Sequence, residues 1–248
     1  MSANGDGGKK KGSSSKKGDK AAIAAERKIY RKIARQLEQM WIMLTGDEGV
    51  GKTTLLNVFM DKDFIPSDDY AFTTTDLAEV SRKGWLPEIY RKKLPKRAKG
   101  IVTLNIRDTG GSSELEELRL EFYSFQSVLF ICLPLYFTSK KKAEEAIGRI
   151  KNFWVKEARA MNPKLPFVLV GTKSDERDNK DLQGFKISQK DGKQLAAHVG
   201  AQDYREVSCY TRDAVEALFK VGFDLHADAI HGDLELAKAK NEKSCFVM

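Results

Sequence analysis

The sequence has few cysteines, and none is placed to form a disulfide framework or a metal site. Cys132 lies inside an apolar run, Cys209 ends another, and Cys245 is the fourth residue from the C-terminus. Disulfide-rich and zinc-binding domains need cysteines at paired or regular spacings, which these three do not show. We therefore expect no disulfide framework and no cysteine-based metal centre.

Long hydrophobic runs are also missing. No run reaches the roughly 20 apolar residues of a membrane-spanning helix, and the chain does not start with the charged and then apolar pattern of a secretory signal. We expect a protein made in the cytosol. With 248 residues and 41% hydrophobic content it can bury a full core, and alternating strand and helix patterns predict one α/β domain with tails.

Positive charge is abundant but unevenly placed. The formal net charge is +8, yet residues 1–36 alone carry +8 and residues 82–99 carry +7, which leaves the rest of the chain at −7. A nucleic-acid-binding domain carries its basic residues on the folded surface, whereas here they lie in one tail and one insertion. This distribution favours an anionic membrane surface over nucleic acid as the partner. A purely solubilising role is the alternative.

The N-terminal region divides into two segments. Residues 1–20 are rich in Gly, Ser and Lys, cannot bury apolar surface, and are predicted to form a disordered basic tail. Within residues 21–39, apolar side chains such as Ile23, Tyr30 and Ile33 fall near one helical face and basic residues occupy the others. This pattern predicts a basic amphipathic helix that either lies on a membrane or packs against the domain.

A phosphate-binding loop is the strongest motif. Residues 46–53 read G-D-E-G-V-G-K-T, between an apolar run at 41–44 and a helix-like segment at 54–60. Glycines in such a loop let backbone N–H groups turn toward phosphates, Lys52 reaches the terminal phosphates, and the Thr53 hydroxyl can ligate Mg²⁺. The alternative is a chance glycine turn, but the flanking strand and helix supply the context that the motif requires.

Later segments indicate which base is bound. A strand pattern at 101–107 precedes Asp108, which can hold Mg²⁺ through water, and Gly111, whose N–H can meet a γ-phosphate. The apolar run at 166–170 leads to Asp175, a carboxylate that can accept two hydrogen bonds from guanine, whereas adenine has no matching donor pair. A third strand precedes Ser208 and Cys209, whose backbone N–H groups can reach a guanine carbonyl.

In this order, the four motifs resemble the Ras superfamily of small GTPases over about residues 40–229. The runs at 127–134, 153–157 and 167–175 are most similar to the Rho subfamily, as is Thr172 where most relatives carry asparagine. The resemblance implies a P-loop NTPase fold, α/β, with a mostly parallel sheet flanked by helices. We expect a monomer.

The resemblance also sets the domain boundaries. It implies a small GTPase domain over residues 40–230, with residues 82–99 as a basic insertion between the two switch segments and residues 231–248 as a C-terminal tail. The insertion is expected to be an exposed loop that contacts a partner or lipid, or is passive. Residues 176–191 are shorter than the corresponding Rho segment and longer than that of Ras.

The resemblance implies a set of site residues for GTP or GDP and Mg²⁺. Tyr70 would close over the phosphates, Thr73 would touch the γ-phosphate, and Phe72 replaces the usual proline, with Thr74 as a substitute for Thr73. The Mg²⁺ ligands would be Thr53, Thr73 and, through water, Asp108. The residues implied to contact the nucleotide are Glu48, Gly49, Val50, Gly51, Lys52, Thr53, Thr54, Tyr70, Thr73, Gly111, Thr172, Lys173, Asp175, Ser208 and Cys209.

Two catalytic positions depart from the family pattern. Ser112 stands where relatives carry the glutamine that orients the attacking water, and Glu48 stands where they usually carry glycine. Serine is too short to orient the water, and a carboxylate at position 48 crowds the γ-phosphate and any activating arginine. We predict weak hydrolysis by a protein that cycles slowly as a signalling switch or stays GTP-bound as an effector-binding module. One alternative is a conventional GTPase, in which exchange factors load GTP and an activating protein supplies the missing groups; if hydrolysis is normal, Glu48 or Glu114 would have to position the water. Another is an ATP-dependent enzyme, which Asp175 argues against.

The C-terminus reads Cys245, Phe246, Val247, Met248 and has the form of a C-a-a-X box, which predicts farnesylation of Cys245. One lipid chain anchors weakly, so the basic N-terminal tail is expected to supply a second signal. We expect the cytoplasmic face of membranes, mainly the plasma membrane, with a cytosolic pool. Effectors, exchange factors and activating proteins would bind the switch segments.

Overall fold

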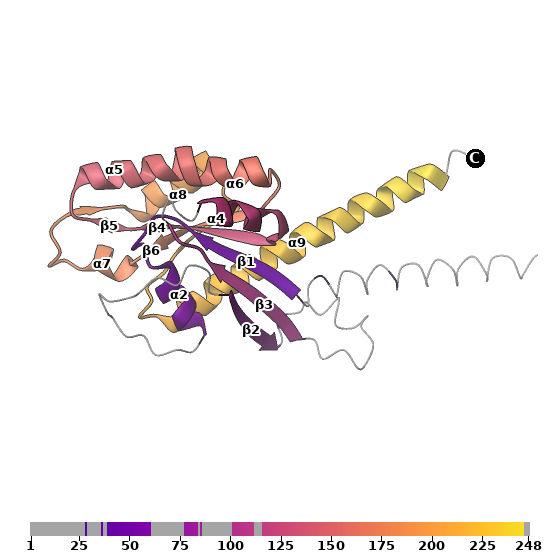
Figure 1. Cartoon of the computed structure of the whole chain (residues 1–248), viewed down its shortest axis with the longest axis horizontal. Helices are drawn as coiled ribbons and strands as arrows, with labels where there is room; N and C mark the ends of the chain where they lie inside the picture. The colour runs from indigo at the N-terminus through magenta and orange to yellow at the C-terminus, as the bar shows by residue number, and fades with distance from the viewer. Residues whose placement is uncertain are drawn as a thin grey trace, which may run out of the picture.

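The computed structural model describes residues 39–60, 77–83, 101–111 and 116–245, together with residues 28, 36 and 85. Figure 1 shows a central sheet with helices on both faces. The strands are β1 (Gln39–Thr45), β2 (Leu77–Lys83), β3 (Ile101–Asp108), β4 (Val128–Pro134), β5 (Tyr136–Phe137), β6 (Phe167–Thr172), β7 (Phe185–Lys186) and β8 (Asp203–Glu206). The helices are α2 (Lys52–Phe59), α4 (Glu116–Phe122), α5 (Lys140–Arg149), α6 (Val155–Met161), α7 (Ser174–Asp178), α8 (Gln189–Val199) and α9 (Arg212–Cys245), with a 3-10 turn η2 (Tyr123–Phe125) and a π-helical turn η3 (Ile150–Trp154).

The main sheet has the strand order β2-β3-β1-β4-β6-β8. All neighbouring pairs are parallel except β2 and β3, which run antiparallel from Leu77 opposite Arg107 to Lys83 opposite Ile101. The predicted α/β fold with a mostly parallel sheet flanked by helices is confirmed. Because the carboxyl ends of parallel strands meet at one edge, the loops that follow β1, β3, β6 and β8 gather there, where open α/β sheets bind ligands.

The core has two layers, one on each face of the sheet, because successive strand residues point to opposite faces. In β4, Phe130 packs with α2 and α9, whereas Leu129 and Ile131 pack with α5, η3, α6 and α8. Every residue of β4 before Pro134 is buried, as expected for a central strand covered by helices on both faces. The apolar runs of the sequence therefore form the innermost strands.

The β2–β3 hairpin is held onto the domain by Trp85, two residues beyond β2. The Trp85 ring lies 6.3 Å from that of Phe59 in α2 and 5.8 Å from that of Phe223 in α9, measured between centroids. Trp85 is half-buried, so the insertion predicted as an exposed loop at residues 82–99 is wrong for this residue. Arg82 and Lys83 belong to β2, and the remainder of the insertion, apart from Trp85, lies outside the described residues.

The predicted terminal segments are described only in part. Of residues 21–39, Lys28 and Gln36 are helical and Gln39 already begins β1; residues 1–20 lie outside the described part. Residues 231–245, predicted as a tail, continue α9, whose far end extends beyond the sheet in Figure 1. Among the described residues, no helix is long and apolar enough to cross a membrane.

Candidate functional site

The phosphate loop, residues 46–53, connects β1 to α2 at the carboxyl edge of the sheet. Gly46 has φ 135° and Gly51, at the N-cap of α2, has φ 97°, conformations that favour glycine. A Cβ on Gly46 would also lie 2.6 Å from the Cys132 carbonyl oxygen of β4. The first glycine of the motif is therefore required by both backbone conformation and packing.

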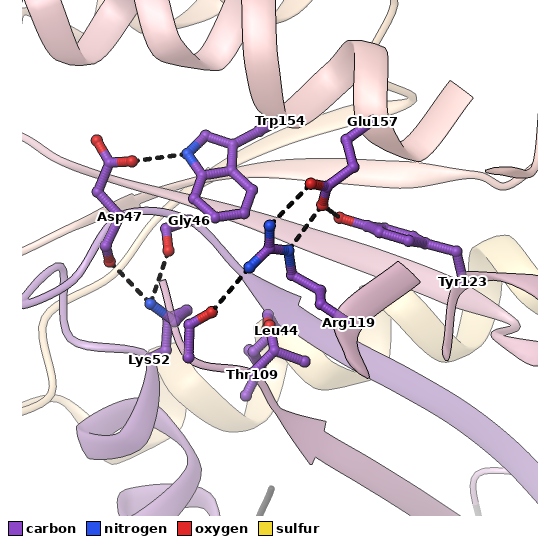
Figure 2. A network of polar contacts seen from close by, with 10 residues as sticks. Leu44, Gly46, Asp47, Lys52, Thr109, Arg119, Tyr123, Trp154 and Glu157 are labelled. Carbon is purple, nitrogen blue, oxygen red and sulfur yellow. Dashed lines mark hydrogen bonds and ion pairs between the residues drawn. The ribbon is translucent and has the colours of Figure 1, made fainter. Parts of the chain in front are cut away.

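Lys52 lies over this loop. Its Nζ donates to the carbonyl oxygens of Gly46 and Asp47, at 2.8 Å each, and the residue is 7% exposed (Figure 2). Burial lowers the pKa of Lys52, and the nearby Asp108 carboxylate opposes this shift. The ammonium group is thus held against the backbone of the phosphate loop.

Thr53 and Asp108 meet at the start of α2 and the end of β3. The Thr53 hydroxyl donates a hydrogen bond to Asp108 Oδ2. The turn after β3 is fixed to β1 because Thr109 Oγ1 donates to the Leu44 carbonyl oxygen at 2.7 Å. A hydroxyl and a carboxylate are the hard oxygen ligands that Mg²⁺ prefers, so this pair fits a magnesium ion.

The Gly110–Gly111 turn lies directly against the phosphate loop. A Cβ on Gly111 would be 2.5 Å from the Glu48 backbone nitrogen and 2.6 Å from the Gly46 carbonyl oxygen. Only glycine allows this approach. Glu48 itself is exposed, and Ser112, which follows Gly111 in the chain, lies outside the described residues. Of the two unusual positions of the sequence, Glu48 therefore lies at the contact between turn and loop.

The two segments predicted to read the base, residues 172–175 and 207–209 (hereafter the base-reading loops), lie beside the phosphate loop. Thr172 Oγ1 donates to the Val50 carbonyl oxygen at 2.7 Å, although the two residues are 122 positions apart. Ser174 N–H donates to the Val207 carbonyl oxygen at 3.2 Å, which joins the two base-reading loops. Lys173 has φ 58°, a left-handed conformation that is rare for non-glycine residues and typical of functional sites.

Sequence reasoning missed a polar group that supports the ends of these loops. Arg177 Nη1 donates to Glu206 Oε2 at 2.5 Å, and the Tyr204 hydroxyl donates to Glu206 Oε1 at 2.8 Å. Glu206 comes just before the second base-reading loop, so the ion pair fixes α7 to the end of β8. The sequence shows only that Arg177 and Glu206 are charged residues close to the two predicted base-reading motifs. It does not show that they pair with each other.

A second missed polar group surrounds the Asp47 side chain of the phosphate loop, and Figure 2 shows its contact with Trp154. Asp47 Oδ1 accepts from Arg149 Nε at 2.6 Å and from Trp154 Nε1 at 2.8 Å. The motif leaves position 47 free, so its role could not be read from spacing. The Asp47 side chain thus ties the loop to α5 and η3.

Arg119 in α4 and Glu157 in α6 form a buried ion pair beside the Gly110–Gly111 turn. Arg119 Nε and Nη2 donate to the two Glu157 carboxylate oxygens at 2.7 and 2.8 Å, and Arg119 Nη1 donates to the Gly110 carbonyl oxygen at 3.2 Å. The Tyr123 hydroxyl donates to Glu157 Oε1 at 2.7 Å. Burial, and then the Glu157 charge, raises the pKa of Tyr123, so the phenol remains a donor.

The described part of the predicted site is contiguous at the carboxyl edge of the sheet. It contains Glu48, Gly49, Val50, Gly51, Lys52, Thr53, Thr54, Asp108, Gly111, Thr172, Lys173, Asp175, Ser208 and Cys209. Tyr70, Thr73 and Ser112 lie outside the described residues, so the first switch segment stays a prediction. Cys245 is the last residue of α9 and is not part of this edge.

The fold and the site together define a P-loop nucleotide-binding domain, because a strand, a glycine loop and a helix carry Lys52 and Thr53 beside a second loop that ends in Asp175. A family model described as "Ras family" matches residues 41–224. The chain belongs to the Ras family, and its relatives identify it as a Rho-like small GTPase.

Three curated relatives support this assignment. The chain is 32% identical over 186 residues to "Rho-related GTP-binding protein RhoD" of Homo sapiens, covering 72% of this chain and 79% of the relative. It is 32% identical over 184 residues to "Rho-related protein racM" of Dictyostelium discoideum, covering 72% and 85%. It is 27% identical over 217 residues to "GTP-binding protein RHO1" of Candida albicans, covering 84% and 94%.

Proposed function

We propose that the protein binds GTP and GDP with Mg²⁺ at the carboxyl edge of the sheet. The observation that carries the proposal is the hydrogen bond from Thr172 to Val50, because it joins the loop that would read guanine to the loop that would hold phosphates. Lys52 would contact the terminal phosphates, and Asp175 would accept hydrogen bonds from guanine. Two of the relatives are named as GTP-binding proteins.

Mg²⁺ would be held by Thr53 and, through water, Asp108, with Thr73 as a further ligand. When bound, the ion neutralises charge on the β- and γ-phosphates. The contact between the Thr53 hydroxyl and the Asp108 carboxylate supports this assignment, because both groups already face one point between α2 and β3.

We further propose that the protein acts mainly in its GTP-bound form. Glu48 adds a carboxylate beside the place of the γ-phosphate, and Ser112 is too short to orient a water molecule. The Glu48 side chain is exposed at the phosphate loop, where it would crowd an arginine supplied by an activating protein. Removing these contributions takes away much of the roughly 10⁵-fold acceleration available to activated GTPases.

The proposed setting is the cytoplasmic face of membranes, mainly the plasma membrane. A farnesyl group on Cys245 and the basic residues of segment 1–36 would provide two weak signals that together hold the protein at an anionic surface. The partners would be effectors and exchange factors that bind around the switch segments, as in Rho-like GTPases generally. In this setting the protein is a membrane-associated signalling module.

The direct test of the nucleotide site is to purify the protein with Mg²⁺, release its bound nucleotide and identify it by chromatography. We expect a guanine nucleotide, mainly GTP. Titration with fluorescent GDP and fluorescent ADP should then show binding of GDP alone. Adenine nucleotide, or no binding of either probe after Mg²⁺ is restored, would contradict the assignment of Asp175.

The membrane proposal has its own test. Cys245→Ser removes the lipid acceptor and should move a fluorescently tagged protein from the cell membrane to the cytosol. Met248→Leu is the matched control, because a terminal leucine still directs prenylation, with a geranylgeranyl group. Membrane localisation that survives Cys245→Ser would show that the basic segments or another feature suffice.

A further inference from the structure

One helical stretch contacts both loops that would surround the γ-phosphate. η3 ends at Trp154 and α6 continues directly, so Trp154 and Glu157 are three residues apart and lie on one side of the helix. The Trp154 indole donates to Asp47 of the phosphate loop at 2.8 Å. Glu157 forms an ion pair with Arg119 (Figure 2), and Arg119 in turn donates to the carbonyl oxygen of Gly110.

The Arg119–Glu157 ion pair is almost fully removed from solvent. The Arg119 side chain is 1% exposed and that of Glu157 is 7% exposed. A buried ion pair of this kind is weak evidence for stability, because desolvation offsets the attraction between the charges. Its bidentate geometry, with Tyr123 as a further donor, instead gives a fixed orientation. We therefore consider the ion pair as a device that orients the groups bound to Arg119.

Arg119 fixes the orientation of one peptide group, the one between Gly110 and Gly111. The carbonyl oxygen of Gly110 and the N–H of Gly111 belong to the same planar trans peptide unit, in which they point in opposite directions. The hydrogen bond from Arg119 to the carbonyl therefore also sets the direction of the Gly111 N–H. Glycine residues have no intrinsic preference that would hold this unit, because both sides of it lack a Cβ.

We propose that Arg119 and Glu157 are positioning residues for recognition of the γ-phosphate. The ion pair holds the Gly110–Gly111 peptide against the phosphate loop before nucleotide binds. This lowers the free-energy cost of ordering the Gly111 N–H to contact the γ-phosphate, which GTP has and GDP lacks. It thereby raises the affinity for GTP relative to that for GDP, since only an interaction that differs between two ligands discriminates between them. This inference rests on the proposed function.

The test variant is Arg119→Met combined with Glu157→Gln. The two substitutions keep similar side-chain volumes and leave no buried charge unpaired, and the new amide at position 157 can still accept from Tyr123. Arg159→Met is the matched control, because Arg159 is also in α6 but donates to the Pro163 and Leu165 carbonyl oxygens, away from the loops. Dissociation constants are measured with fluorescent GDP and a fluorescent non-hydrolysable GTP analogue at fixed Mg²⁺.

We expect the ratio of the GDP to the GTP-analogue dissociation constant to fall by about tenfold in the double variant. The change should come from weaker GTP-analogue binding, with GDP affinity nearly unchanged and the ratio unaffected by Arg159→Met. A merely structural role would weaken both nucleotides equally, so an unchanged ratio would overturn the inference. If the wild-type protein binds neither nucleotide, the proposed function itself fails.

A milder variant covers the case in which the double variant does not fold. Arg119→Lys keeps the positive charge next to Glu157 but loses the planar fork that reaches Glu157 and Gly110 together. Its ratio should fall by a few-fold. A folded Arg119→Lys protein with the wild-type ratio would contradict the inference independently of the double variant.

Discussion

At the scale of single residues, base recognition at the proposed site would depend on Asp175, which lies in the first turn of α7, three residues after Thr172 and its hydrogen bond to Val50. The carboxylate can accept from two guanine donors at once, which no neutral side chain at this position can do. The specificity of the proposed site for guanine therefore rests on the Asp175 side chain, and hydrogen bonds of the preceding residues Thr172 and Ser174 fix the backbone that carries it.

Asp175→Asn should weaken GDP binding by a hundredfold or more, because each hydrogen bond to a charged group contributes about 1.5–3 kcal/mol. The amide can donate to the extra carbonyl of xanthine, so the affinity for xanthosine diphosphate should rise. Competitive titration against fluorescent GDP measures both changes. Asp178→Asn, an exposed carboxylate in the same helix, is the control and should change neither affinity.

Cys209 gives a second prediction at this scale. Burial, and then the nearby Asp175 charge, raises the pKa of Cys209 to about 11 from a reference of 9.0. Since the thiolate is the reactive form, at pH 8 Cys209 should react with iodoacetamide about a hundredfold more slowly than a free thiol. The rate should increase as the pH rises toward 11. Labelling of Cys209 in the native protein as fast as in guanidinium-unfolded protein would contradict this.

At the scale of elements, α9 is held to the sheet by close packing at one glycine. A Cβ on Gly222 would lie 2.7 Å from the tip of the buried Phe130 ring in β4. The same helix carries Phe219, whose ring lies 3.8 Å from that of Phe59 in α2, and Phe223, which contacts Trp85. α9 thus packs against β4, α2 and the loop of the β2–β3 hairpin, and together they form the core layer on one face of the sheet.

Gly222→Ala should destabilise the protein by about 1 kcal/mol, because the overlap with Phe130 costs more than the gain in helix propensity. Gly232→Ala is the matched control in the same helix. A Cβ there meets nothing within 4 Å, so this change should stabilise by about 0.5–1 kcal/mol. Urea denaturation measures both. Equal effects of the two substitutions would show that α9 does not pack as described.

At the scale of the whole molecule, contiguous motifs could be predicted from the sequence and tertiary pairings could not. The strand predicted at 41–44 is part of β1, and the helix predicted at 54–60 begins two residues earlier as α2. Periodicity and the P-loop pattern are local, so they locate such elements well. Trp154 and Asp47 are 107 residues apart, and nothing local in either segment indicates that they meet.

The packing of Trp85 could not be predicted for the same reason. Its neighbours suggest an exposed basic loop, but the β2–β3 hairpin brings the ring against Phe59 and Phe223. The position of a hairpin on helices far away in the sequence is a property of the whole fold. The basic charge of the insertion is therefore compatible with a half-buried aromatic residue near its beginning.

In the proposed function, the protein binds GTP and hydrolyses it slowly because of Glu48 and Ser112. The most direct measurement is single-turnover decay of loaded GTP in the wild-type protein and in a variant with Glu48→Gly and Ser112→Gln. We predict a wild-type rate well below the order of 10⁻⁴ s⁻¹ seen for intrinsic hydrolysis by small GTPases, and a variant that is at least about tenfold faster. A wild-type protein that hydrolyses bound GTP as fast as the variant would show that Glu48 and Ser112 do not slow hydrolysis.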